Sequence, residues 1–229
     1  MPTFPSFSRL SLVAASILAT CSPHALCQTS ALDYVPNLPY TAQIATTVVM
    51  TQADGTSVQR ETKLIESRDS EGRTRIEDFS CGASRPVMVN LFFPLRRQIV
   101  QLIPGQKMAR VITFPGTGPI PTHGLNPNAV KVTVEKLPGQ ILHGIFAEGT
   151  RTTQVLPAKR GNGPDVVFVE ETWVSPDLKL MVLNKDTNTH PGSDQTTSEL
   201  VRLDRSEPDA AFFEIPADYR IVEEPTGPR

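Results

Sequence analysis

Tyr40–Thr51, YTAQIATTVVMT, leads through Ala53-Asp54-Gly55 into residues 56–68, TSVQRETKLIESR. The first stretch is rich in Thr and Val, and the second is polar and alternating, with Val58, Leu64 and Ile65 as its apolar members, which predicts two β-strands. Asp54-Gly55 supplies the positive φ that a tight hairpin turn needs. Ser70-Glu71-Gly72 predicts a second turn, into a strand over residues 73–79. The three segments therefore predict an antiparallel meander with one face toward water.

The same alternation continues along the chain, with a turn signal about every ten residues. We predict only one helical turn, over residues 208–211, capped by Ser206 and pinned to the core by Phe212 and Phe213. Residues 215–219 are expected to end the fold, and residues 223–229 to be frayed. Together these features predict an all-β fold of about 10–11 short antiparallel strands with at most short helical turns. The further strands are predicted over residues 87–93, 97–103, 107–112, 129–137, 140–147, 148–156, 166–174, 178–184 and 199–205.

The first residues predict export. Arg9 precedes the apolar run LSLVAASILA of residues 10–19, and Ala25-Leu26-Cys27 ends the segment with a small-x-small pattern. This order is typical of a secretory signal peptide, which we place at residues 1–27. We expect a periplasmic or extracellular protein in which residues 28–229 form a single β-rich domain. The Pro/Gly-rich loop 114–128 connects its two halves, and a domain boundary there is equally consistent with the sequence.

Charge and cysteine content exclude some partners. The chain has 22 basic and 24 acidic residues, and removal of residues 1–27 takes away Arg9 and no acid, which leaves a net charge of −3. Nucleic-acid binding needs a basic footprint that this chain lacks. No apolar run approaches the length of a membrane span, so any membrane contact is peripheral. Cys81 is the only cysteine after the signal peptide. Whether Cys21 is lipidated stays open; if it were, a Cys27–Cys81 bridge would become possible.

Several turns and strand ends, from Leu38-Pro39-Tyr40-Thr41-Ala42 to the closing Phe212-Phe213-Glu214-Ile215-Pro216, resemble those of uncharacterised secreted bacterial β-rich proteins. More distantly, the ending F-x-x-P-x-x-Y is similar to the periplasmic lipoprotein-carrier and sigma-regulator-sensor superfamily. That resemblance implies a curved antiparallel meander sheet, a half-open barrel that cups acyl chains under a helical lid. The lid helices are not evident here and the aromatic lining is thin, so no ligand residues are carried over. The matching segments are Leu38-Pro39-Tyr40-Thr41-Ala42, Arg68-Asp69-Ser70-Glu71-Gly72-Arg73, Gly144, Gly149-Thr150-Arg151, Trp173-Val174-Ser175-Pro176-Asp177-Leu178, Glu199-Leu200, Glu207-Pro208-Asp209, Phe212-Phe213-Glu214-Ile215-Pro216 and Tyr219.

Catalytic and metal-binding motifs are absent from the sequence. No G-x-S-x-G, S-x-x-K, H-E-x-x-H, C-x-x-C or P-loop occurs. His123, His143 and His190 are widely separated, and a zinc site would need them to converge with a carboxylate. Residues 186–190 imitate the start of a calcium loop, but the glycine is displaced and the closing Glu is missing, which favours a polar hairpin loop. Cys81 would be a nucleophile only beside a histidine. We therefore predict no catalytic residue, no metal and no cofactor.

Two charged groups suggest binding. Glu171 and Trp173 share a strand face, whereas Glu170 points the other way, so the two carboxylates cannot act as a pair; Trp173 as a core anchor is the favoured interpretation. Arg68, Arg73, Arg75, Arg96, Arg97 and Arg151 would attract an anion if they gathered on one face. Because Glu61, Glu66, Glu71 and Glu77 are interleaved with them, cross-strand pairing on a solvated face is the better expectation.

Three functions follow as hypotheses. The first is a non-enzymatic exported protein that binds or carries a lipid, a lipoprotein or another apolar ligand in the cell envelope. The second is an envelope structural or protein-interaction module that uses exposed strand edges, and the third is an enzyme with an unrecognised site. The sequence assigns no ligand-binding residue. Apolar positions that would line either an open cup or a closed core are Val48, Met50, Leu91, Ile99, Leu102, Val132, Val134, Ile145, Phe146, Phe168, Leu180 and Val182.

Overall fold

The described part of the chain is a single twelve-stranded sheet. A computed structural model describes residues 33–52, 54–80, 82–116, 129–157, 164–190 and 193–224, so the predicted signal peptide and most of the predicted loop lie outside it. The all-β prediction is confirmed, because the only helical elements in these ranges are three short 3₁₀ turns. The strands are β1 (Tyr40–Thr51), β2 (Ser57–Arg68), β3 (Thr74–Phe79), β4 (Met88–Phe93), β5 (Gln98–Ile103), β6 (Met108–Thr113), β7 (Lys131–Leu142), β8 (Ile145–Leu156), β9 (Val166–Ser175), β10 (Leu180–Asn188), β11 (Asp194–Asp204) and β12 (Arg220–Glu224).

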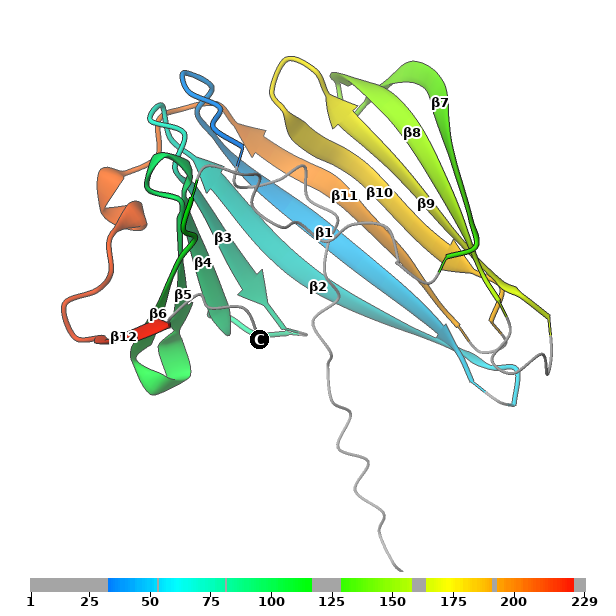
Figure 1. Cartoon of the computed structure of the whole chain (residues 1–229), viewed down its shortest axis with the longest axis horizontal. Coiled ribbons are helices and arrows are strands. Elements are labelled where there is room, and N and C mark those ends of the chain that lie inside the picture. The colour runs from blue at the N-terminus through cyan, green and yellow to red at the C-terminus, as the bar shows by residue number, and fades with distance from the viewer. Residues whose placement is uncertain are drawn as a thin grey trace, which may run out of the picture.

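Two meanders join at the centre of the sheet. The strand order is β12-β6-β5-β4-β3-β2-β1-β11-β10-β9-β8-β7, so β1–β6 and β7–β11 are consecutive and β1 pairs with β11 between them (Figure 1). Every pair is antiparallel except β6–β12, which is parallel. The sheet curves but does not close, and Figure 1 shows its edge strands β12 and β7 at opposite sides of the molecule.

Some strand boundaries differ from the prediction. Residues 140–147 and 148–156 are predicted as separate strands, but β8 runs unbroken through that boundary and the turn lies at His143-Gly144. Both turn residues have positive φ, 49° and 77°, as in the two-residue turns that match strand twist. Residues 220–224, beyond the expected end of the fold, form β12. A short polar segment shows no alternation strong enough to reveal a parallel edge strand.

The turns that the sequence indicates have clear local causes. Gly55 (φ 83°) and Gly72 (φ 77°) occupy the left-handed conformation at the β1–β2 and β2–β3 turns. The chain breaks at Pro94 and Pro104 have the same local structure, a 3₁₀ turn followed by one residue in the left-handed conformation. They are η1 (Pro94–Arg96), followed by Arg97, and η2 (Pro104–Gln106), followed by Lys107. Proline fits the first position of each turn because its ring fixes φ near the required value. These short links hold β4, β5 and β6 in register.

The helical turn near the C-terminus is η4 (Ala210–Phe213). Its cap is Asp209, whose carboxylate accepts a hydrogen bond from the Ala211 N–H at 2.9 Å, so the predicted Ser206 cap is wrong. Asp209 lies directly before the turn, where a short carboxylate reaches the free N–H groups, and Ser206 lies too early in the chain. The predicted role of Phe213 is confirmed by its burial, whereas Phe212 is 48% exposed.

The sheet curves toward the face that carries Tyr40 and Arg68. Arg68, at the end of β2, donates a hydrogen bond to the Leu178 carbonyl in the β9–β10 turn, although β1 and β11 lie between. In a flat sheet β2 and β10 would lie about 14 Å apart, beyond the reach of an arginine side chain. We call this the inner face and the opposite one the outer face. Directly paired residues share a face, so the strand register assigns the paired side chains to a face outside the irregularities in β1–β11, β9–β10 and β7–β8.

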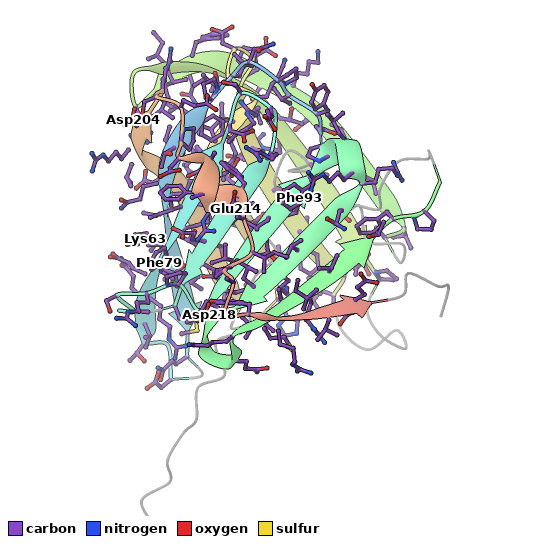
Figure 2. All side chains as sticks on the ribbon, turned by 90° about the vertical axis from the view of Figure 1, so that its left-hand side faces the viewer. Lys63, Phe79, Phe93, Asp204, Glu214 and Asp218 are labelled. Carbon is purple, nitrogen blue, oxygen red and sulfur yellow. The ribbon has the colours of Figure 1, made fainter. Side chains whose placement is uncertain are left out.

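Buried apolar side chains form three clusters. One packs on the inner face of β1–β3 with Met181 of β10, and another lies where the ends of β8–β11 meet β1. The third covers the outer face of β4–β6, where Ile215 and Tyr219 pack against it. In Figure 2 the segment from Asp204 through Glu214 to Asp218 crosses this outer face. The C-terminal segment therefore closes the outer side of this half of the sheet. The members are Ile44, Leu64 and Ile76; Tyr40, Ala42, Ile145, Ala147, Trp173, Leu178, Leu180, Val182, Leu183 and Leu200; and Val89, Leu91, Phe93, Val100, Leu102 and Ala109.

Candidate functional site

A row of small polar side chains crosses the middle of the inner face. The Thr46 and Ser198 hydroxyls lie 2.9 Å apart, and the Asn184 amide donates to Thr172 at 3.1 Å and to Glu170 at 3.2 Å. The buried Asn184 Oδ1 accepts no hydrogen bond within the described part of the chain. The floor of the inner face is therefore polar, in contrast to the apolar floor of a purely hydrocarbon cup. The polar row consists of Thr150, Thr172, Asn184, Ser198, Thr46 and Thr62, on six neighbouring strands.

Apolar side chains flank the polar row on both sides. On the β7–β9 side Val132, Val134 and Phe168 are 38%, 62% and 39% exposed. Val132 and Phe168 lie in one line, because both pair with Gln154. The flank on β4–β6 is partly exposed along its length. The first wall is the flank on β4–β6, formed by Met88, Phe92, Ile99, Ile103, Met108 and Ile112. The second wall is the flank on β7–β9, formed by Val132, Val134, Leu156 and Phe168.

A buried polar cluster fixes one end of the inner face. The Tyr40 hydroxyl donates to Glu66, and the Arg68 guanidinium stacks 4.5 Å from the centre of the Tyr40 ring. Burial raises the pKa of Glu66, although the Tyr40 hydrogen bond and the Arg68 charge act in the opposite direction. Burial, and then the charge of Glu66, raise the pKa of Tyr40. Because Arg68 also donates to the Leu38 and Leu178 carbonyls, the cluster ties the end of β2 to the segment before β1 and to the β9–β10 turn.

The twelve apolar positions predicted to line a cup or a core divide between both roles. Five of them are buried: Leu91, Leu102, Ile145, Leu180 and Val182. Four are exposed by more than a third, namely Val132, Val134, Phe146 and Phe168, and the other three, Val48, Met50 and Ile99, are intermediate. Leu91 and Leu102 belong to the outer cluster, whereas Val48, Met50, Ile99, Val132, Val134 and Phe168 belong to the inner face.

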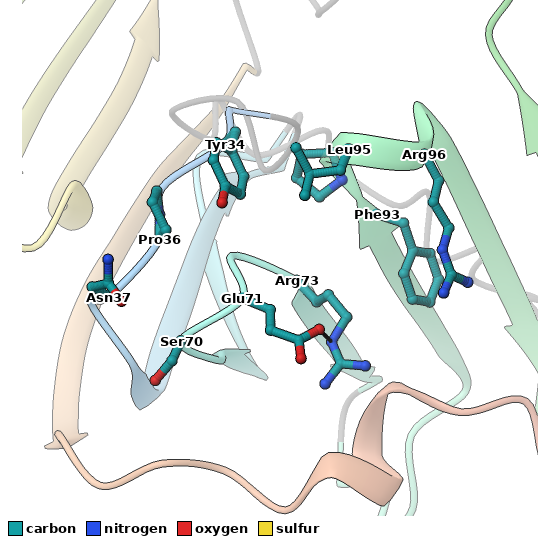
Figure 3. A pocket seen from close by; sticks show the side chains of 10 residues that line it. Tyr34, Pro36, Asn37, Ser70, Glu71, Arg73, Phe93, Leu95 and Arg96 are labelled. Atoms are coloured by element: carbon teal, nitrogen blue, oxygen red, sulfur yellow. Dashed lines mark ion pairs between the residues drawn. The ribbon is translucent and has the colours of Figure 1, made fainter.

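A separate pocket of about 390 Å³ opens on the outer side, between residues 34–37 before β1, the β2–β3 turn and η1 (Figure 3). Tyr34 and Phe93 contribute aromatic rings to it. Arg73 is neutralised by Asp69 at 2.5 Å and approaches Glu71 at 3.5 Å, an ion pair drawn in Figure 3. Arg96 lies 5.4 Å from the centre of the Phe93 ring. The charges nearly cancel, so the pocket suits a small neutral or aromatic group more than an anion.

The residues considered for catalysis are not brought together where the structure describes them. His143 occupies the β7–β8 turn, 3.6 Å from Glu199, and His190 follows β10 near the opposite end of the strands. His123 and Cys81 lie outside the described residues. Residues 186–188 end β10 as a strand, and Asp186 pairs in register with Glu170 and Thr196, so the predicted loop begins later than expected. Within the described ranges no three His, Cys, Asp or Glu side chains gather as metal ligands would.

The two charged groups differ in outcome: Trp173 is the core anchor that the sequence favours, whereas Arg68 and Arg75 depart from the expected cross-strand pairing on a solvated face, because Arg68 is buried and Arg75 pairs within its own strand. Glu171 shares the outer face with Trp173 and accepts from Arg151 at 2.6 Å, whereas Glu170 lies on the inner face beside Asn184. Trp173 is a buried member of the core, 7% exposed. The six arginines do not form one surface, since Arg68 lies on the inner face and Arg75 pairs with Glu77 at 2.6 Å on the outer face.

Sequence reasoning missed the polar row. Its residues belong to strands whose half-polar character is evident from the sequence, but the face to which the polar side chains point depends on register across strands far apart in sequence. The available signal is the alternation of Thr150, Thr152 and Gln154 in β8, which by itself favours an exposed strand.

Among the described residues no helix is both long and apolar enough to cross a bilayer.

Neither a family model nor a curated protein sequence matches this chain. Among solved structures it is similar to MucB in complex with MucA(peri), with 11% identity, a TM-score of 0.43 and coverage of 81% of this chain and 57% of that one. The chain thus spans little more than half the length of that MucB chain. A DUF1329-family protein from Desulfovibrio piger has 10% identity and a TM-score of 0.33, covering 77% and 90%. A LolA-superfamily protein from Nitrosomonas europaea has 7% identity and a TM-score of 0.32, covering 81% and 94%. These neighbours match the distant resemblance inferred from the sequence, as a likeness of fold.

Proposed function

We propose that this chain is an exported, non-enzymatic binding protein that holds an amphipathic, lipid-like molecule against the inner face of its open sheet. The observation that carries the proposal is the second wall, where Val132, Val134 and Phe168 stay exposed on the inner face. Covering such side chains is favourable by about 25 cal/mol for each Å² of apolar surface removed from water. A bound acyl chain or lipidated protein would supply that cover.

The polar row favours an amphipathic ligand over a pure hydrocarbon. The partly exposed hydroxyl groups of the row, such as those of Thr150 and Thr172, lose hydrogen-bonding water when an apolar ligand covers them. The Thr172 hydroxyl, which accepts from Asn184, would donate its own hydrogen to a polar group on the ligand. A lipid with a polar group, or a lipidated polypeptide, satisfies the floor and the walls together. Paired hydroxyls and amides are also suited to binding more than to proton transfer.

Native mass spectrometry of the protein, purified from the periplasm without detergent, tests this proposal. We expect additional mass of a phospholipid or acyl chain, reduced strongly in Phe168→Asp because a carboxylate disrupts the second wall. The matched control is Ile221→Asp, since Ile221 is 56% exposed but lies on the outer face of β12. A bare mass together with no rise in melting temperature on adding a lysophospholipid would refute the proposal.

Export is part of the same proposal, and the mature N-terminus tests it. We expect the periplasmic protein to begin near Gln28, after removal of residues 1–27. An intact mass that includes residues 1–27 would contradict cleavage. A mass showing acylated Cys21 would replace it with a lipid anchor, and would leave Cys27 in the mature chain.

A second candidate function is an envelope protein-interaction module. The observation that favours it is the open edge of β7, a strand of 12 residues that pairs only with β8. Free N–H and C=O groups on a sheet edge can add a strand from another chain. A protein that stays monomeric and retains no defined partner from its own envelope would contradict this candidate.

A further inference from the structure

The edge strand β7 is uncovered along its length. Only Leu137 and Leu142 are partly buried, and all its other side chains are exposed. The opposite edge of the sheet, β12, has 5 residues, so β7 offers much the longer row of free backbone groups. A long edge with exposed apolar residues is a template for pairing with another chain.

Only the first half of β7 is regular enough to pair. The register with β8 shifts between Leu137 and Gln140, and Pro138 within this bulge has no N–H to donate. Bulges and prolines are the devices that block edge pairing. Residues 131–136, in contrast, keep an unbroken register with β8, and the Val130 N–H that precedes them is held by the Val155 carbonyl. Any added strand is therefore directed to residues 130–136.

We propose that residues 130–136 pair antiparallel with the same residues of a second copy, about a two-fold axis through Thr133. This inference rests on the second candidate function, in that the β7 edge is a partner surface, and it names the partner. In this register Lys131 lies opposite Glu135 of the second copy, and Val132 lies opposite Val134. The symmetry repeats each pair, as in any isologous interface. Centring the axis on Val132 or on Val134 instead places Thr133 opposite Lys131 or Glu135 and leaves the charges unmatched.

The two charges are available for such pairing. Lys131 forms no ion pair with any residue in the described ranges. Glu135 is 55% exposed and lies 3.7 Å from Arg151, whose guanidinium is already held by Glu171 at 2.6 Å. Opposite charges directly across two strands are stabilising, and like charges there are destabilising. Lys131 and Glu135 share the outer face, so their pairing would not disturb the inner face.

The apolar residues of the seam lie on the inner face. Val132 and Val134 are 38% and 62% exposed in the single chain and would cover each other across the two-fold axis. Because the axis is perpendicular to the sheet, the inner faces of both copies point to the same side. The second walls of the two copies would then form one continuous apolar surface.

Charge exchange across the seam tests the proposal by analytical ultracentrifugation over a dilution series. We expect reversible dimers of the unmodified protein. Lys131→Glu and Glu135→Lys should each raise the dimer dissociation constant by roughly tenfold or more, because each places like charges opposite each other at both ends of the seam. The double variant K131E/E135K should restore dimerisation. A protein that is monomeric at every concentration overturns the proposal, as do single variants that dimerise normally or a double variant that does not recover.

A cysteine scan tests the register separately. In a Cys81→Ser background, Thr133→Cys should form a disulfide-linked dimer under mild oxidation, because only the residue on the axis faces its own copy within disulfide range. Glu135→Cys is the matched control and should stay uncrosslinked. Crosslinking through Glu135→Cys alone would exclude the Thr133 register. Native mass spectrometry of the charge variants measures lipid retention and so tests the proposed lipid binding separately from dimerisation. A monomer that binds a different envelope protein would support the second candidate function and would refute self-pairing.

Discussion

Glu66 is a carboxyl group whose protonation is linked to folding. Its pKa is raised by burial, so the folded protein binds a proton more tightly there than the unfolded chain does. The resulting stability is present below the ordinary Glu value of 4.5 and is lost as the pH rises through the raised value. We predict that Glu66→Gln, which keeps an oxygen acceptor for Tyr40, flattens the fall in unfolding free energy from about pH 4.5 toward neutrality.

Urea unfolding of both proteins over this range of pH measures the difference. Asp78 provides a matched comparison, because burial also raises its pKa, and Asp78→Asn should remove a second contribution of the same sign. Parallel pH profiles for the unmodified protein and Glu66→Gln would show that the carboxyl is as well solvated in the folded state as in the unfolded state.

Gly149 is a residue whose missing side chain makes room for its neighbours. A Cβ there would lie 2.5 Å from Trp173 Nε1 and 2.8 Å from the Leu137 Cβ. We predict that Gly149→Ala lowers the unfolding free energy by about 1–3 kcal/mol, because the Trp173 ring must shift in a packed core. Gly105→Ala is the control, since a Cβ added at Gly105 would meet no atom within 4 Å. Equal denaturation midpoints for the two variants would contradict the contact.

Single residues are predictable where local alternation decides their environment. Trp173 as a core anchor, and Glu170 and Glu171 on opposite faces, follow from the period of one strand. Asn184 could not be recognised in this way, because its partners Thr172 and Glu170 come from the neighbouring strand and its burial depends on β11 as well. Register across separate strands is a tertiary property.

At the scale of elements, η4 gives a sharp contrast between two adjacent phenylalanines. Phe213 is 3% exposed and carries Arg73 over its ring, whereas Phe212 is 48% exposed. We predict that Phe213→Ala lowers the unfolding free energy by about 3–5 kcal/mol, because it removes a buried aromatic side chain between the C-terminal segment and the sheet.

Phe212→Ala is the matched variant and should change stability by no more than about 0.5 kcal/mol. The hydrogen bond that Arg75 donates to the Phe212 carbonyl involves only the backbone of residue 212 and is retained. Chemical denaturation of both variants decides the point. Similar losses would mean that residues 205–219 are held by the backbone and not by the buried ring.

The strands themselves are largely predictable from the sequence, and their ends are less so. Pro94 and Pro104 mark two turns correctly because proline excludes a ladder donor. The boundary between β7 and β8 is misplaced by the sequence pattern because Pro138-Gly139 resembles a turn, whereas the structure absorbs it as a bulge and turns at His143-Gly144. A turn signal and a bulge signal use the same residues, and only the partner strand distinguishes them.

For the whole molecule, the topology leads us to propose one cooperative domain and not two. The halves before and after residues 117–128 meet through β1 with β11 and through β6 with β12. We predict that fragments divided within residues 117–128 copurify when coexpressed and that neither folds alone. Leu200→Asp, at a position 1% exposed and opposite Ile44, should abolish copurification. Two separate unfolding transitions in the intact chain would contradict a single domain.

The pairing of β1 with β11 also determines the order in which the strands of a newly synthesised chain can pair. Thr46 of β1 contacts Ser198 of β11, which lies 152 residues later in the chain. The ribosome therefore releases β1 long before β11, the second strand that pairs with it, has been synthesised. Until β11 arrives, the β1 edge that will become the middle of the sheet remains open to any other strand. An unfinished chain is therefore most prone to aggregation through its earliest strand, and a holding chaperone that shields residues 40–51 would have the largest effect on yield.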